Sequence, residues 1–350
     1  MENTNRKSVE IKKIRGVLPS SEALFSSTKS QARWYRIQEK IIENMLLLAT
    51  IISSTAIFFI ILFVAKEALS SLKHNGLAFF IAGGWDQHIQ EAWFSETPKW
   101  DFGALPLILG TFLTTGGALL LTFVLGTGCA IFLAELAPDA IRRPVEAMVR
   151  LLAGIPSVIF GLIGLMVVVP FIMDNFISNE LALKFIAVAP LDGQSLLAGV
   201  IVLTFMVLPF YVTVATDAIR AVPKPYKEAS LALGVTQWRS VTKVLIPVAI
   251  PGIVTGMILA SARAVGEAIA LSMVSGGMAF IPDPSHGLVF FLEPVRVMAS
   301  AIIDNKEAMS VKAIESALFG VGTILLFISI LLSLTARLVF SWYQKQVMAK

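Results

Sequence analysis

Cysteine and charged residues are both scarce in this sequence of 350 residues. The single cysteine, Cys129, cannot form a disulfide within the chain, and a metal cluster built on several cysteines is excluded. Charged residues make up 15% of the chain, whereas soluble proteins carry about 25%. Because a soluble protein of this size needs a charged surface, the composition excludes an ordinary soluble enzyme.

Motifs for catalysis and for ATP hydrolysis are absent from the sequence as well. There is no G-x-x-x-x-G-K-[ST] loop, no G-x-S-x-G elbow and no H-E-x-x-H pair. The three histidines lack the spacing of metal ligands, and the net charge of +4 does not by itself indicate nucleic-acid binding. We therefore expect no catalytic, cofactor, metal or nucleic-acid site, and we expect a separate protein to hydrolyse any ATP.

Long apolar runs are abundant, since hydrophobic residues make up 56% of the chain. A helix needs about 20 mostly apolar residues to cross the hydrocarbon core of a bilayer. Six runs are long enough: residues 44–65, 105–134, 151–173, 195–216, 248–276 and 313–340. The sequence predicts an all-α, multi-pass membrane protein with six transmembrane helices, in a membrane domain spanning residues 44–340. The polar arm before it has no small-residue cleavage site, which favours a membrane anchor over a cleaved signal peptide.

Positive residues are distributed unevenly between these runs. Residues 1–43, 135–150, 217–247 and 337–350 contain twenty Lys and Arg residues, whereas the alternate segments contain seven. Lys and Arg concentrate in cytoplasmic loops. The sequence therefore predicts that the arm (1–43), the 217–247 loop and the tail (341–350) are cytoplasmic. We interpret the arm as a solvated tail, with contact to anionic membrane lipid as the alternative.

The 217–247 loop carries the most specific pattern in the chain. Pro223 and Pro225 suit a helix start, and Gly234 is placed to end that helix in a left-handed conformation. A second short helix is expected over residues 238–244, before Pro247. The loop reads Glu228-Ala229-Ser230, three residues, Gly234, nine residues, then Val-Leu-Ile-Pro247. This pattern resembles the EAA loop of binding-protein-dependent ABC import permeases, with Ser in place of the second Ala.

The resemblance implies what this loop does. In that family the EAA loop inserts into a groove on an ATPase subunit and transmits its motion to the membrane helices. Glu228, Ala229, Gly234 and Pro247 are accordingly the residues expected to couple this chain to an ATPase.

Further segments resemble the PstC-type subunit of phosphate ABC importers: residues 102–111, 151–162 and 262–268. The likeness covers the chain from about residue 100 onward, and Ala268 departs from the Thr usual in the family. It implies a type I ABC importer permease in a bacterial inner membrane that transports inorganic phosphate. Its implied partners are a PstA-type permease subunit, two copies of a cytoplasmic ATPase and an external phosphate-binding protein.

Arg263 and Glu267 are charged residues inside the fifth apolar run. Four residues apart on a helix, they would share one face and could pair. An arginine at this depth costs about 2.5–3.5 kcal/mol on insertion scales, so such residues usually line a path or a bundle interior. One interpretation is a structural ion pair. The other is a translocation path where Arg263 attracts an oxyanion and Glu267 holds that arginine in place.

Two small-residue segments also have two interpretations. Ser157 follows Gly154 and Pro156, and Thr111 lies beside Gly110. Close helix packing explains the glycines, whereas a broken helix with free N–H groups and hydroxyls would line an anion path. The Gly252-x-x-x-Gly256 spacing predicts tight helix packing.

Other functions remain open at this stage. An ABC permease for molybdate or sulfate is the nearest alternative. A secondary transporter driven by an ion gradient is disfavoured by the EAA-like loop, and a regulatory scaffold is disfavoured by charges at membrane depth.

Overall fold

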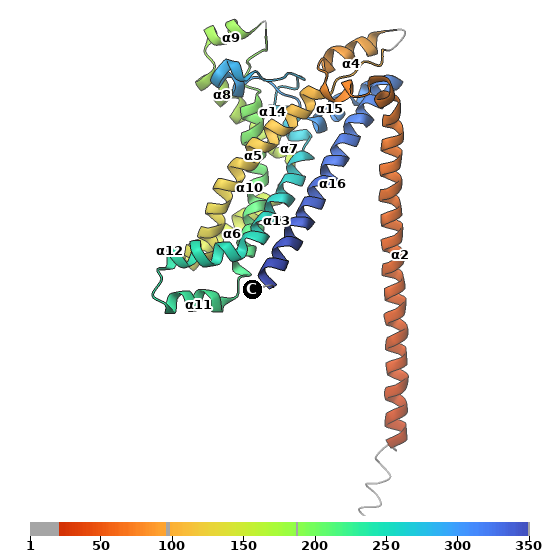
Figure 1. Ribbon diagram of the computed structural model, residues 1–350, viewed down its shortest axis with the longest axis vertical. Helices are drawn as coiled ribbons and strands as arrows, with labels where there is room; N and C mark the ends of the chain where they lie inside the picture. The colour runs from red at the N-terminus through yellow and green to blue at the C-terminus, as the bar shows by residue number, and fades with distance from the viewer. Residues whose placement is uncertain (1–20, 96–98, 187, 349–350) are drawn as a thin grey trace, which may run out of the picture. The chain divides into compact units, whose positions relative to one another are not determined.

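The computed structural model describes residues 21–95, 99–186 and 188–348, which form helices joined by short loops (Figure 1). The chain divides into two units, residues 1–62 and residues 63–350. Helix α2 (Ser21–Asn75) crosses this division. In the first unit its side chains from Ile41 to Ile60 are exposed, as expected of an apolar helix that faces lipid.

The second unit holds the other helices. The α-helices are α3 (Ala78–Ile81), α4 (Trp85–Phe94), α5 (Leu105–Ile131), α6 (Asp139–Ala153), α7 (Ser157–Ile163), α8 (Val169–Phe176), α9 (Asn179–Phe185), α10 (Leu196–Arg220), α11 (Lys224–Ala232), α12 (Gln237–Ser240), α13 (Ile246–Val265), α14 (Ile269–Val274), α15 (Met298–Asp304) and α16 (Lys312–Met348). Three π-helical segments continue these helices: η1 (Phe132–Leu136), η2 (Gly164–Val168) and η3 (Val241–Leu245). Two 3₁₀ segments are η4 (Pro284–Leu292) and η5 (Lys306–Ser310).

In the part of the chain that the structure describes, six continuous helices are long and apolar enough to cross a membrane, which confirms the predicted all-α fold class. They span Gln38–Asn75, Leu105–Leu136, Ser157–Phe176, Leu196–Arg220, Gln237–Val265 and Lys312–Val339. Their boundaries differ from the predicted ones because hydropathy locates the apolar part of a helix and not its ends. The first helix, for example, already runs from Ser21, since residues 21–43 contain neither Gly nor Pro.

Two predicted runs are interrupted. The run 151–173 is divided because α6 ends at Ala153 and the next helix begins only at Ser157, after Pro156. Proline disfavours helical geometry in the residue before it, which accounts for the break. The run 248–276 ends as a helix at Val265, and α14 starts at Ile269. The prediction of one helix through both Arg263 and Glu267 is therefore wrong.

The expected stop before Pro247 is also wrong. α12, η3 and α13 form one continuous helix, with Pro247 in the first turn of α13. Proline lacks the N–H for a normal helical bond and crowds the preceding turn. The π-helical turn of η3 lies directly before it, and such a local widening accommodates the proline without ending the helix.

Helix α10 is the centre of the bundle and its most buried membrane helix. α5, α6 and α13 pack against it, and buried side chains of α5, α10 and α13 form much of the main apolar core. Small residues permit the close approach of α13. A β-carbon at Gly252 would lie 2.5 Å from Ala218 Cβ, and one at Gly256 would lie 3.0 Å from Val214 Cγ1. The packing predicted from the glycine spacing is confirmed.

Gly252→Ala should destabilise this contact, because the added methyl overlaps Ala218 across the helix interface. We expect a loss of about 1–3 kcal/mol, measured as a lower thermal unfolding temperature of the purified protein in detergent. Gly128→Ala is the matched control, since a β-carbon there meets nothing within 4 Å. Equal stability of both variants would contradict the close packing of α10 and α13.

Candidate coupling surface and translocation path

The segment between α10 and α13 projects from one end of the bundle, beside the C-terminal end of α16 (Figure 1). α11 carries Pro225 in its first turn, where its fixed φ suits the helix start. Gly234 follows α11 with φ of +78°, and its N–H donates to Leu231 O at 2.9 Å. A β-carbon at Gly234 would meet nothing within 4 Å, so the need for glycine is conformational.

The predicted coupling residues are accessible on this segment. Glu228 and Ala229 on α11 are exposed, as is Gly234 directly after it. The hydroxyls of Ser230 and Ser240 form a hydrogen bond that fastens α11 to α12. The predicted helix–glycine–helix arrangement is confirmed, except that the second helix continues into α13.

A second set of contacts fastens this segment to the end of α5. Lys227 Nζ lies 2.5 Å from Glu135 Oε2 of η1, and Gln237 Nε2 donates to the backbone oxygen of Glu135 at 3.2 Å. The Glu135 side chain is only 11% exposed, so water screens this ion pair less than a surface pair. α11 and α12 are thus both bonded to Glu135, in the last turn of the second membrane helix.

The end of α10 is fixed in a similar way. Arg220 donates to Leu133 O at 2.9 Å and pairs with Glu146 of α6. The hydrogen bond from Arg220 lowers the pKa of Glu146 below its ordinary value, opposing the effect of partial burial. These contacts surround a cavity of about 810 Å³ next to α11. The charged residues that line it are Glu135, Arg142, Arg143, Glu146, Arg220, Lys224, Lys227 and Glu228.

Arg263 lies before the break between α13 and α14, and Glu267 lies within it. Arg263, in the last turn of α13, is exposed, with its guanidinium carbon 5.8 Å from the Phe210 ring centroid. Glu267 is half-buried, and its Oε1 accepts a hydrogen bond from Ala270 N at 3.1 Å, which caps α14. Within the described residues no ion pair joins the two side chains. The predicted mutual pair is wrong, because Gly266 ends the helix and Glu267 turns to the N–H groups of α14.

Thr111 is buried and its hydroxyl is occupied by the fold. It donates to Leu107 O at 2.8 Å and accepts from Met298 N at 2.9 Å, so it fixes the start of α15 against α5. Thr111 also lines an apolar cavity of about 150 Å³ together with Val265, two residues beyond Arg263.

Ser157 is half-buried in the first turn of α7, directly after the break at Pro156. α7 packs against α14, since a β-carbon at Gly161 would lie 2.8 Å from Ala270 Cα. The helix that begins with Ser157 is therefore a neighbour of the helix that Glu267 caps. Three of the four predicted path residues lie on packed helices and Glu267 lies between two of them, but no hydrogen bond or ion pair connects the four in the described structure.

Sequence reasoning missed the contacts that fix the coupling segment. Glu135 and Lys227 are 92 positions apart, and a single sequence gives no signal that they meet. Their location next to membrane helix ends is visible in the sequence, but many charged residues share it.

Comparison with known proteins agrees with these features. Residues 126–348 match the family model described as the inner membrane component of binding-protein-dependent transport systems. A phosphate transport system permease protein PstC from Mesorhizobium japonicum is 36% identical over 255 residues, covering 71% of this chain and 75% of that protein. A probable ABC transporter permease protein, YqgH, from Bacillus subtilis is 33% identical over 321 residues, covering 91% and 94%.

A solved structure is also similar in fold. The bacterial alginate ABC transporter, solved in complex with an alginate pentasaccharide-bound periplasmic protein, has a chain that aligns with a TM-score of 0.52 and 16% identity. The alignment covers 86% of this chain and 96% of that one. Together with the matched family model and the relatives, the six long apolar helices and the segment that projects between α10 and α13 lead to one assignment: this chain belongs to the family of inner membrane permease components of binding-protein-dependent ABC importers.

Proposed function

We propose that this chain is a permease subunit of an ATP-driven phosphate importer and forms half of its translocation path. The observation that carries the coupling function is the exposed surface of α11 and Gly234, bonded to the end of α5 through Lys227 and Glu135. The phosphate substrate is supported by the relatives named as phosphate transport permeases, of which one is 36% identical.

Coupling would begin at Glu228, Ala229 and Gly234, which we propose contact an ATPase subunit. A displacement of α11 is passed to η1 by the Lys227–Glu135 ion pair and to α12 by the bonded serines. Pro247 lies in the first turn of α13, and the helix runs through it from α12 without a break. ATP binding and hydrolysis on the partner can thereby shift the membrane helices between two arrangements.

Phosphate would pass near Arg263, which is exposed when this chain is taken without a partner subunit. Arginine donors match two phosphate oxygens at once. We propose that Glu267 and Ser157 flank the same path, while Thr111 shapes it by holding α15 against α5. An exposed arginine in a membrane helix is consistent with a path completed by a second permease subunit, which we propose to be of the PstA type. The other proposed partners are two copies of an ATPase and an external phosphate-binding protein.

The orientation follows from the charge distribution. The segments rich in Lys and Arg support a cytoplasmic position for α11, α12 and the C-terminal end of α16. These elements do lie at one end of the second unit (Figure 1). We propose that both termini are cytoplasmic and that α4, α15 and the loop between α14 and α15 face the outside of a bacterial inner membrane.

The first test is uptake of labelled phosphate by phosphate-starved cells that carry the intact chain, a deletion or Gly234→Pro. Proline cannot adopt φ of +78° and lacks the N–H that bonds to Leu231 O, so uptake should be lost in both mutants. Gly76→Pro is the matched control, because Gly76 also has positive φ, a bonded N–H and no close neighbour. Excess sulfate and molybdate should not compete.

Each other outcome has a defined meaning. Unchanged uptake on deletion, in cells without a second phosphate system, would assign another oxyanion to this permease. Normal uptake with Gly234→Pro alone would remove the coupling argument and favour a secondary transporter.

The charged path residues give a second prediction. Arg263→Gln and Glu267→Gln should each lower phosphate uptake by about tenfold or more, because the first removes the arginine–oxyanion contact and the second removes the charge of the carboxylate that caps α14. Lys306→Gln, an exposed cation of η5, is the control. Uptake that survives both substitutions in an assembled complex would assign these charges to packing alone.

The ion pair between Lys227 and Glu135, next to the coupling surface, gives a third prediction. Lys227→Met and Glu135→Gln should each lower the phosphate imported per ATP hydrolysed several fold, because the motion of α11 is no longer passed to η1. The double exchange Lys227→Glu with Glu135→Lys should restore much of it. Transport coupled as in the wild type after either single substitution would contradict this role.

A further inference from the structure

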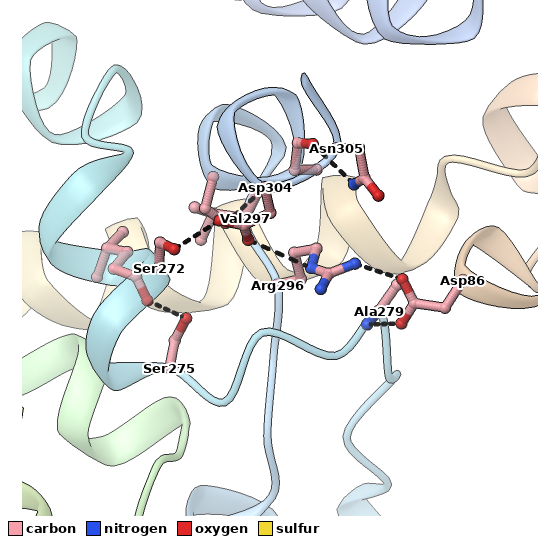
Figure 2. Close-up of polar contacts among 11 residues, drawn as sticks. Asp86, Ser272, Ser275, Ala279, Arg296, Val297, Asp304 and Asn305 are labelled. Atoms are coloured by element: carbon pink, nitrogen blue, oxygen red, sulfur yellow. Dashed lines mark hydrogen bonds and ion pairs between the residues drawn. The ribbon is translucent and has the colours of Figure 1, made fainter. Parts of the chain in front are cut away.

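A network of charged residues lies at the end of the bundle opposite α11 (Figure 2). Its centre is Arg296, whose side chain is 15% exposed. Nη1 of Arg296 pairs with Asp86 of α4, and Nε lies 3.7 Å from Asp304 Oδ2 at the end of α15. The two contacts differ: the first is a hydrogen bond, whereas the second is only an electrostatic contact.

The remaining oxygens of both carboxylates are also bonded. Asp86 Oδ2 accepts from Ala279 N at 2.7 Å, and Asp304 Oδ1 accepts from Ser272 Oγ at 2.6 Å (Figure 2). Ser272 belongs to α14, and Ala279 lies in the loop after it. One guanidinium therefore connects α4, α14, α15 and the loop after α14.

The backbone of Arg296 is fixed by contact with α5, whereas its side chain lies between two carboxylates. A β-carbon at Gly110 of α5 would lie 2.4 Å from Arg296 O, so the two backbones are in direct contact. Two residues later, Met298 N is bonded to Thr111 of the same helix. Any change of partner must consequently come from the arginine side chain and not from its backbone.

The network reaches the proposed path through α14. This helix has six residues, and Glu267 caps its N-terminal end while Ser272 bonds to Asp304. A helix this short moves as one body. A shift of Asp304 relative to Arg296 is therefore passed to Glu267, next to the exposed Arg263.

The charges argue against a ligand at this position. Two carboxylates face one guanidinium, so the network carries excess negative charge and would repel phosphate. The buried Nε of Arg296 has no hydrogen-bond partner among the described residues, although buried donors are normally bonded. The carboxylate 3.7 Å away is the partner it would reach after a small rotation.

We propose that Arg296 is a positioning residue of the translocation path, and that its guanidinium alternates between Asp86 and Asp304 as α14 moves during transport. This inference rests on the proposed importer function. The structure holds the Asp86-bonded position, and the Asp304-bonded position belongs to the other arrangement of the helices. Arg296 acts on Glu267 through α14 and does not itself contact the substrate.

The test compares Asp86→Asn with Asp304→Asn in the complete importer, reconstituted in proteoliposomes with its ATPase and binding protein. Asp86→Asn weakens the position seen here, whereas Asp304→Asn weakens the other one. The quantity measured is the ratio of the ATPase rate without phosphate-loaded binding protein to the rate with it. We expect this ratio to rise in one variant and to fall in the other, by about threefold or more in each. Glu91→Gln on α4, which removes a carboxylate from an exposed ion pair with Lys99, should change nothing.

A purely structural network would give a different result. Changes in the same direction for both variants, or rates like those of Glu91→Gln, would overturn the proposal. Asp304→Glu provides the second measurement should an Asn variant fail to assemble. This variant keeps the charge and brings a carboxylate nearer to Nε of Arg296, so it must shift the ratio of the two ATPase rates in the same direction as Asp86→Asn. An unchanged ratio would likewise overturn the proposal. Phosphate uptake by the wild-type proteoliposomes is measured in parallel, so absence of uptake there refutes the importer function separately.

Discussion

Hydrocarbon offers no hydrogen-bond partners, and this constraint determines where the chain can leave a helix. Every backbone N–H and C=O at membrane depth must be bonded within the protein. The breaks at residues 154–156 and 266–268 accordingly lie at the ends of membrane helices, and side chains or neighbouring helices bond to the chain there. Glu267 supplies a carboxylate to the N–H groups of α14, and α7 restarts directly against α14. Of the proposed path residues, Arg263, Glu267 and Ser157 lie at or next to these breaks, whereas Thr111 lies within α5.

The fold was largely predictable from the sequence, since each crossing is an apolar run that must form a helix. The coupling segment was predictable for the same local reason: Pro225 and Gly234 define a helix start and end within ten residues. Local patterns did not predict where α13 ends. Helical spacing placed Arg263 and Glu267 on one face, but a glycine between them and a capping carboxylate ended the helix first.

Contacts between distant residues were not predictable at all. Arg296 and Asp86 are 210 positions apart, and Lys227 and Glu135 are 92 apart. Nothing in a single sequence selects these partners among the other charged residues outside the membrane. Both pairs nonetheless follow one physical rule, because a charge near the bilayer that is withdrawn from water requires a partner. The two ends of the bundle are each held by such pairs.

The continuous helix from Gln237 to Val265 has a mechanical consequence. With a rise of about 1.5 Å per residue, its 29 residues form a rod roughly 40 Å long. One end begins directly after the segment that carries Gly234, and the other end carries Arg263. A tilt imposed at the first end would be passed along this helix to the arginine, and it would have to pass Pro251, where one backbone hydrogen bond of the helix is missing. The π-helical turn before Pro247 preserves the connection, because a break there would separate the segment that carries Gly234 from Arg263.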